Sequence, residues 1–179
     1  MKPMNTMRAI TLLLGLAVGS TLAQGATETT AQPDPQPVQI QQIRNATAKI
    51  NYAGKTFLLD PLLAKKGEYP GFPGTFHSER RNPLVDLPMP VTEVMKGVDA
   101  VIVSHTHLDH WDGGHHNFIP KDIPLFVQHA ADAKLIRDQG FKDVRILEED
   151  TVFEGVHLTK TGGQHGSDQM FSNHQVAAL

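Results

Sequence analysis

The feature that most constrains this chain is an apolar run that ends in a cluster of histidines. Residues 99–104 (DAVIVS) form a continuous apolar run with β-branched side chains, which predicts a buried strand. Residues 105–110 (HTHLDH) follow at once and hold four side chains of the kind that bind metals. Because polar groups packed beside a buried strand need compensation, the cluster predicts a metal site.

The spacing within the cluster indicates how its members are directed. Side chains two apart in an extended backbone point the same way, so His105 and His107 are expected to face one cation. Where the loop turns, Asp109 and His110 are expected to face a second cation about 3.5–4 Å away.

A further ligand candidate lies near the C-terminal end of the sequence. His165 stands in residues 161–166 (TGGQHG), just after a predicted strand at residues 156–161. The glycines would let the backbone approach a crowded site. With no cysteine in the chain, every metal ligand must be nitrogen or oxygen.

Three segments resemble a known family. Residues 58–61 (LLDP), 101–112 (VIVSHTHLDHWD) and 161–166 are similar to the metallo-β-lactamase superfamily, within its branch of metal-dependent hydrolases related to L-ascorbate-6-phosphate lactonase. The resemblance covers about residues 38–173. It implies an α/β fold, the αββα sandwich, of which this chain would supply a truncated N-terminal half: one β-sheet with flanking helices.

The resemblance also implies a role for each ligand-type residue. Asp60 would support the site from outside the coordination sphere, although an aspartate before a proline is also a common turn opener. Family members normally run longer, and their second half supplies a bridging aspartate and a late histidine, so the second site is expected to be incomplete. The implied ligands are His105, His107 and His165 at the first site, and Asp109 and His110 at the second.

The chemistry expected of such a site is metal-dependent hydrolysis of a small-molecule substrate. Metal-bound hydroxide would attack an ester, lactone, amide or phosphoester, and Asp109 would orient the hydroxide and carry a proton to the leaving group. One or two divalent ions are expected. Zinc is the default for an exported enzyme, and the lactonase resemblance favours manganese.

Two other functions fit parts of the sequence. A truncated chain could be an inactive metal-binding fragment or a partner-dependent half-domain, with an exposed apolar sheet face that forms a homo-oligomer. A nuclease is the second, because the superfamily includes RNA-processing members. The net charge of −3 and the predicted export argue against nucleic-acid binding.

The N-terminus predicts export to the periplasm or the medium. Lys2 and Arg8 precede a short apolar run at residues 9–18, and Ala23 offers a cleavage site, so residues 1–23 are predicted to be a signal peptide. An uncleaved anchor is the alternative, and after cleavage no stable membrane anchor is expected. Residues 24–37 are a polar, proline-rich leader, and residues 38–179 form the predicted domain.

The remaining pattern alternates strands and helices, as in an α/β domain. Residues 61–90 hold six prolines and no clear period, which is typical of a binding loop or a surface excursion. Within that segment His77 could contact substrate, as could His115, which is expected to be exposed after two glycines. The predicted strands are residues 38–43, 46–50, 56–59, 124–128, 143–147 and 156–161, and the predicted helices are residues 90–97 and 130–139.

Overall fold

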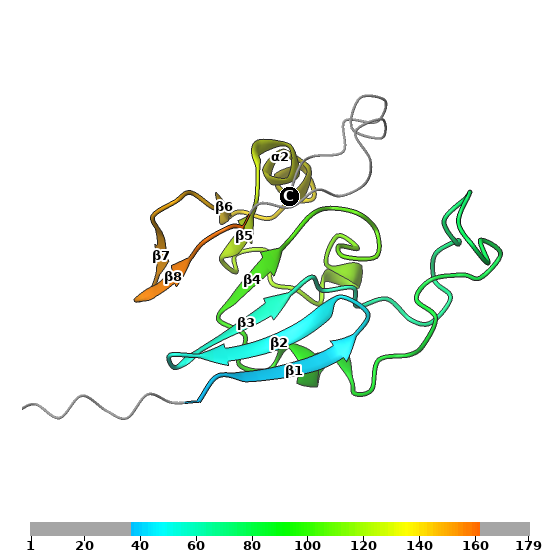
Figure 1. The fold of residues 1–179 in the computed structure, drawn as a ribbon, viewed down its shortest axis with the longest axis horizontal. Coiled ribbons are helices and arrows are strands. Elements are labelled where there is room, and N and C mark those ends of the chain that lie inside the picture. The colour runs from blue at the N-terminus through cyan, green and yellow to red at the C-terminus, as the bar shows by residue number, and fades with distance from the viewer. Residues whose placement is uncertain (1–36, 162–179) are drawn as a thin grey trace, which may run out of the picture. The chain divides into compact units, whose positions relative to one another are not determined.

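A computed structural model describes residues 37–161, and its centre is a six-stranded mixed sheet in the order β1-β2-β3-β4-β5-β6 (Figure 1). Strands β1, β2 and β3 are antiparallel neighbours, whereas β3, β4, β5 and β6 run parallel. The strands are β1 (Gln39–Arg44), β2 (Thr47–Tyr52), β3 (Lys55–Leu59), β4 (Ala100–Val103), β5 (Leu125–Val127) and β6 (Val144–Ile146). A separate hairpin is formed by β7 (Thr151–Phe153) and β8 (Val156–Leu158).

The parallel part of the sheet places the ends of several strands at one edge. β3 and β4 are parallel neighbours, and Leu59 lies beside Ile102. The segments that follow them therefore begin side by side. Asp60 starts the first of these segments and Ser104 starts the second, which is how residues 44 positions apart come into contact.

One face of the sheet is covered by helices. Helices α1 (Val91–Met95) and α2 (Ala130–Asp138) contribute Val94 and Ile136 to a core that contains Val101 and Leu125 from the central strands. Because these side chains are fully buried, this face supplies most of the apolar stabilisation of the fold.

The opposite face, which was expected to be an exposed apolar face, is covered in part. Phe57 and Phe126 on this face are buried against Phe153 of the β7–β8 hairpin, with ring centroids 6.0 and 5.4 Å away. Farther along the sheet, Ile40 and Tyr52 remain 69% and 47% exposed. The hairpin therefore shields the central strands and leaves the β1–β2 side open.

Most predicted elements are found, with two corrections at the C-terminal side. The predicted strand at residues 156–161 ends at Leu158, and its partner β7 was not predicted. β7 has only three residues and follows the acidic residues 148–150, so the sequence shows no alternating pattern that would predict a strand there. Gly140 follows the last helical turn with φ +90°, a conformation that glycine accepts at a helix end.

Residues 61–90 are irregular, as predicted, but the first part of this segment is buried. Arg44 is 5% exposed and donates to the carbonyls of Leu62, Ala64 and Val85 at 2.6, 2.9 and 2.9 Å. The arginine thereby ties both ends of the segment to the edge strand β1.

Several predictions concern parts of the chain outside the described residues. These are the signal peptide at residues 1–23, the leader up to residue 36 and the ligand candidate His165. Within residues 37–161, no helix is long and apolar enough to cross a membrane.

Candidate metal centre

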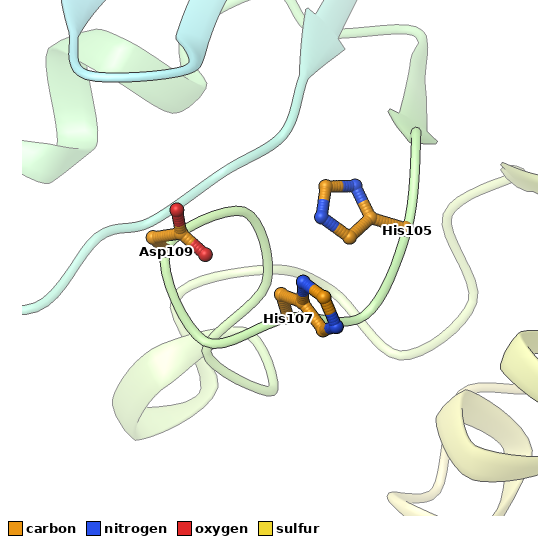
Figure 2. A group of neighbouring side chains, drawn as sticks. All are labelled: His105, His107 and Asp109. Carbon is orange, nitrogen blue, oxygen red and sulfur yellow. The ribbon is translucent and has the colours of Figure 1, made fainter. Parts of the chain in front are cut away.

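Three of the predicted ligands converge in the loop that follows β4. The ligand atoms of His105, His107 and Asp109 all lie within 4.8 Å of one another, close enough for one cation to reach all three (Figure 2). His105 is buried, Asp109 is half-buried and His107 is exposed, so the group opens from the protein interior to the surface. The site could therefore hold a cation and still admit water.

These three donors come from both of the predicted ligand groups. Asp109, predicted to serve a second cation, lies with His105 and His107. His110 lies beside this group: its ring centroid is 4.0 Å from that of His105, and its Nε2 is 3.8 Å from Asp109 Oδ2. The physical reason is the tight turn after His107, where the backbone N–H groups of His110 and Trp111 both donate to the His107 carbonyl.

Asp60 holds this loop from the neighbouring strand end. Its Oδ1 accepts from the Ser104 backbone N–H at 2.6 Å, and its Oδ2 accepts from Ser104 Oγ at 2.7 Å and from His110 Nδ1 at 2.8 Å. The carboxylate is 4% exposed. These contacts bind the start and the end of the ligand loop to one buried anion.

The same contacts decide which histidine nitrogen faces a cation. His110 must donate from Nδ1 to Asp60, which leaves its lone pair on Nε2. Ser104 Oγ donates to Asp60 and can then accept from His105 Nδ1, 3.1 Å away, which likewise directs the His105 lone pair to Nε2. Burial lowers the pKa of His110, but the Asp60 hydrogen bond and the charges of Asp60 and Asp109 outweigh it and leave that pKa raised.

Two more hydrogen bonds hold the loop in place, one to Asp132 and one from Asn45, and the sequence predicted neither. Thr106, between the first two histidines, donates to Asp132 Oδ1 of α2 at 2.6 Å, and Asp132 is 4% exposed. Asn45, in the β1–β2 turn, donates from Nδ2 to the Asp109 carbonyl at 2.9 Å. The positive φ of Asn45 marks a tight turn, but no local signal points to Asp132.

The prediction that His115 is exposed was wrong. It is 9% exposed, and its Nδ1 lies 3.3 Å from the Tyr69 hydroxyl. The preceding Gly114 explains the difference: a Cβ there would lie 2.8 Å from Cζ of Phe141, so the turn packs against the core instead of facing solvent. Asp112 accepts from the His115 backbone N–H at 3.1 Å and fixes this turn.

His77 lies apart from this arrangement of contacts. It is in the exposed part of residues 61–90, where its Nδ1 lies 3.0 Å from Glu79 Oε1 and its ring packs on Phe76 at 4.0 Å. Its predicted contact with substrate gains no support from these neighbours. The predicted ligand His165 lies outside the described residues.

The donor set fits a divalent cation. Two imidazoles and one carboxylate are a common combination for zinc, manganese and iron in proteins. Three protein ligands also leave coordination positions for water or substrate, which distinguishes catalytic sites from closed structural ones. The His110–Asp60 pair lies outside these three donors. It orients the loop in the way that hydrogen bonds to metal ligands commonly orient them.

Comparison with known proteins supports this description. No protein-family model matches the sequence. The chain is similar to the UPF0173 protein YddR of Bacillus subtilis (strain 168), with 52% identity over 136 residues, which are 76% of this chain and 54% of that protein. The chain thus spans about half the length of the relative it matches.

Two solved structures resemble the fold. A possible metal-dependent hydrolase from Veillonella parvula DSM 2008 matches with a TM-score of 0.73 and 50% identity, covering 79% of this chain and 54% of that one. An isothiocyanate hydrolase from Delia radicum gut bacteria matches with a TM-score of 0.70 and 46% identity, covering 76% and 52%. The predicted fold class is confirmed: the chain has the metallo-β-lactamase-like α/β fold of these two structures and is a homologue of the UPF0173 protein YddR.

Proposed function

We propose that this chain is a metal-dependent hydrolase whose cation is held by His105, His107 and Asp109. The observation that carries the proposal is the convergence of these three donors within 4.8 Å at the end of β4. The similarity to a protein described as a possible metal-dependent hydrolase and to one described as an isothiocyanate hydrolase supports it. His110, through Nε2, and His165 are proposed as additional ligands, and zinc or manganese as the cation.

Each side chain of the loop has its own role in the proposed reaction. A bound divalent cation would lower the pKa of a coordinated water to about 7 and polarise the electrophile. His105 and His107 would bind through neutral imidazole nitrogens, and Ser104, which is itself bonded to Asp60, would orient the His105 ring. Asp109 would accept a hydrogen bond from the attacking water through a carboxylate oxygen and pass its proton to the leaving group.

The substrate is proposed by class. An ester, lactone, amide or phosphoester fits the chemistry of the donor set. The neighbour described as an isothiocyanate hydrolase adds a further class of carbon electrophile. With such a substrate, water would add to the central carbon and the carbon–nitrogen bond would break, so that R–NCS and H₂O would give R–NH₂ and COS.

The test is a histidine substitution with a matched control. We expect His107→Ala to lose at least about 100-fold in affinity for Zn²⁺ or Mn²⁺, measured by calorimetry, and to lose hydrolysis of a chromogenic ester. His157→Ala removes an exposed histidine of β8 and should leave both unchanged. Unchanged metal content and turnover in His107→Ala would refute the proposal.

A non-enzymatic function is the second candidate, because the chain spans about half the length of its relatives. In that case the chain would be a metal-binding half-domain that requires a partner. Wild-type protein that binds about one cation per chain, but hydrolyses none of the substrate classes above, would favour this candidate.

We also propose that the protein is exported. The basic residues Lys2 and Arg8, the apolar residues 9–18 and the small residues before Gln24 support the proposal. N-terminal sequencing of the protein from a periplasmic fraction should begin at Gln24. A mature protein that begins at Met1 and stays in the cytoplasm would contradict export.

A further inference from the structure

A cavity lies between the end of β1 and the irregular segment that follows β3. It has a volume of about 300 Å³ and is lined by Arg44, Asn45, Leu62, Asn82, Pro83, Leu84 and Val85. Four of these residues are apolar, and three carry nitrogen donors. A mostly apolar cavity with a few polar groups is the usual composition of a small-molecule site.

Two of the residues that line the cavity form hydrogen bonds with residues of the metal centre. Asn45 donates to the Asp109 carbonyl at 2.9 Å. Leu62 follows Asp60 by two residues and donates from its backbone to the Asp60 carbonyl at 3.0 Å. A molecule in the cavity would therefore lie next to the loop that carries the candidate ligands.

Arg44 gives the cavity an unusual electrostatic character. The residue is 5% exposed, and its guanidinium donates to three backbone carbonyls, yet its buried Nε has no hydrogen-bond partner. Within residues 37–161, no carboxylate lies within 4.0 Å of this cation. Carbonyl dipoles solvate the guanidinium in part, but they do not neutralise its charge.

Other charges reach Arg44 only from a distance. Burial lowers the pKa of Arg44, and the charges of Asp112 and Asp86 offset only part of that effect. Asp112 is itself engaged with the backbone N–H groups of Leu63 and Ala64 at 2.7 and 2.9 Å. A buried arginine beside a cavity, with its charge uncompensated at close range, favours an anionic ligand in that cavity.

We propose that this cavity binds a carboxylate that carries a short apolar chain, with the anion toward Arg44 and the chain against Leu84 and Val85. The inference rests on the proposed function in one respect, namely that such a carboxylate is part of a substrate or is the product of ester or lactone hydrolysis. It therefore favours acyl substrates over the other classes considered above.

The experiment compares three probes on the full chain after metal removal with a chelator, so that binding to a cation cannot contribute. Hexanoate, hexanol and inorganic phosphate are titrated, and affinity is measured by calorimetry or NMR. We expect hexanoate to bind at least about tenfold more tightly than either of the others. Equal affinity for hexanol would overturn anion recognition, and tightest binding of phosphate would overturn the apolar part of the proposal.

Variants locate the binding site. Leu84→Ala removes an exposed wall of the cavity and should weaken hexanoate binding about three- to tenfold. Leu135→Ala makes the same change at an exposed position on α2 and should have no effect. Equal effects in both variants would overturn the assignment of the cavity.

Arg44→Lys keeps the positive charge but not the planar donor array, and should remove most of the preference for hexanoate over hexanol. If this variant does not fold, the comparison of Leu84→Ala with Leu135→Ala still tests the proposal. Failure to bind hexanoate alongside normal Zn²⁺ binding would overturn this inference alone. Normal hexanoate binding without Zn²⁺ binding would overturn the proposed function instead.

Discussion

At the level of single side chains, Asp60 is the residue on which most contacts of the metal centre depend. Its two oxygens accept three hydrogen bonds, from the backbone and hydroxyl of Ser104 and from His110 Nδ1. An amide in its place would turn an NH₂ group toward one of these donors and remove the negative charge.

We therefore expect Asp60→Asn to reduce affinity for Zn²⁺ about 10- to 100-fold, measured by calorimetry. The same change should lower the pKa of His110 in the metal-free protein, because the Asp60 hydrogen bond and charge raise it. NMR titration of the histidine ring protons measures this second effect. Asp122→Asn, at an exposed position, is the control, and an unchanged pKa in Asp60→Asn would contradict the assignment.

The raised pKa of His110 also sets the sign of a pH effect. Its folded-state pKa lies above the ordinary value of 6.5, so its protonation stabilises the folded protein at pH values below that value. This contribution is lost as the pH rises through the folded-state pKa. Asp60→Asn should reduce it, and urea unfolding of metal-free protein on either side of this range measures the change.

At this level the sequence predicted the ligand cluster and proposed Asp60 as its support, but it did not predict the contacts of Asn45 and Asp132. The cluster at residues 105–110 is local, and its spacing alone brings three donors together. Asn45 and Asp132 contact it from distant parts of the chain, and neither stands in a pattern that indicates such a contact. The burial of His115 depends on the packing of Gly114 against Phe141, which a pair of glycines in a sequence does not reveal.

Among the helices and strands, α2 has the most direct effect on the metal centre. Asp132 in its first turn is buried and accepts from Thr106 at 2.6 Å. His129, which precedes the helix, lies 3.2 Å from the other Asp132 oxygen. The first turn of α2 therefore holds the loop between the first two histidines in place.

Thr106→Val should cost about 1–3 kcal/mol of unfolding free energy, because it leaves one oxygen of a buried carboxylate without its donor. It should also weaken Zn²⁺ binding, since the loop between His105 and His107 loses its anchor. Urea denaturation and calorimetry measure the two effects. Thr92→Val, an equal change at an exposed position of α1, should alter neither; a variant at Thr106 that behaves like this control would refute the role of α2.

The β7–β8 hairpin is the element that sequence patterns described least well, yet it covers the central strands. Phe153→Ala should destabilise the protein by about 3–5 kcal/mol, because it removes a ring packed on Phe57 and Phe126. Val152→Ala, on the exposed side of the same strand, should change stability by less than about 0.5 kcal/mol. Chemical denaturation of both variants tests this, and similar midpoints would show that the hairpin contributes little.

For the whole molecule, the β1–β2 side of the sheet is the part that no described residues cover. Ile40 and Tyr52 are exposed there, and Ile50 is partly buried against the core of the same face. Sequence reasoning predicted the central strands well, because continuous apolar runs with β-branched residues are strong signals. It overestimated the exposed face because it did not foresee β7.

We expect the chain to self-associate through this side, in line with the predicted homo-oligomer. Ile40→Lys should shift the mass in sedimentation experiments toward that of a single chain. Gln41→Lys adds the same charge to the neighbouring, opposite-facing position of β1 and should leave the association unchanged. A wild-type protein that sediments as a monomer at high concentration would contradict this expectation.

The ligand loop has a consequence for how the molecule acquires its cation. Its three donors lie within five consecutive residues, so closing them around an ion costs little loop-closure entropy. The contacts that hold the loop rigid come instead from Asn45, Asp60 and Asp132, which are far away in sequence. An unfolded chain can thus bind a cation weakly by itself, whereas tight binding of the cation requires that β1, β3 and α2 have already assembled.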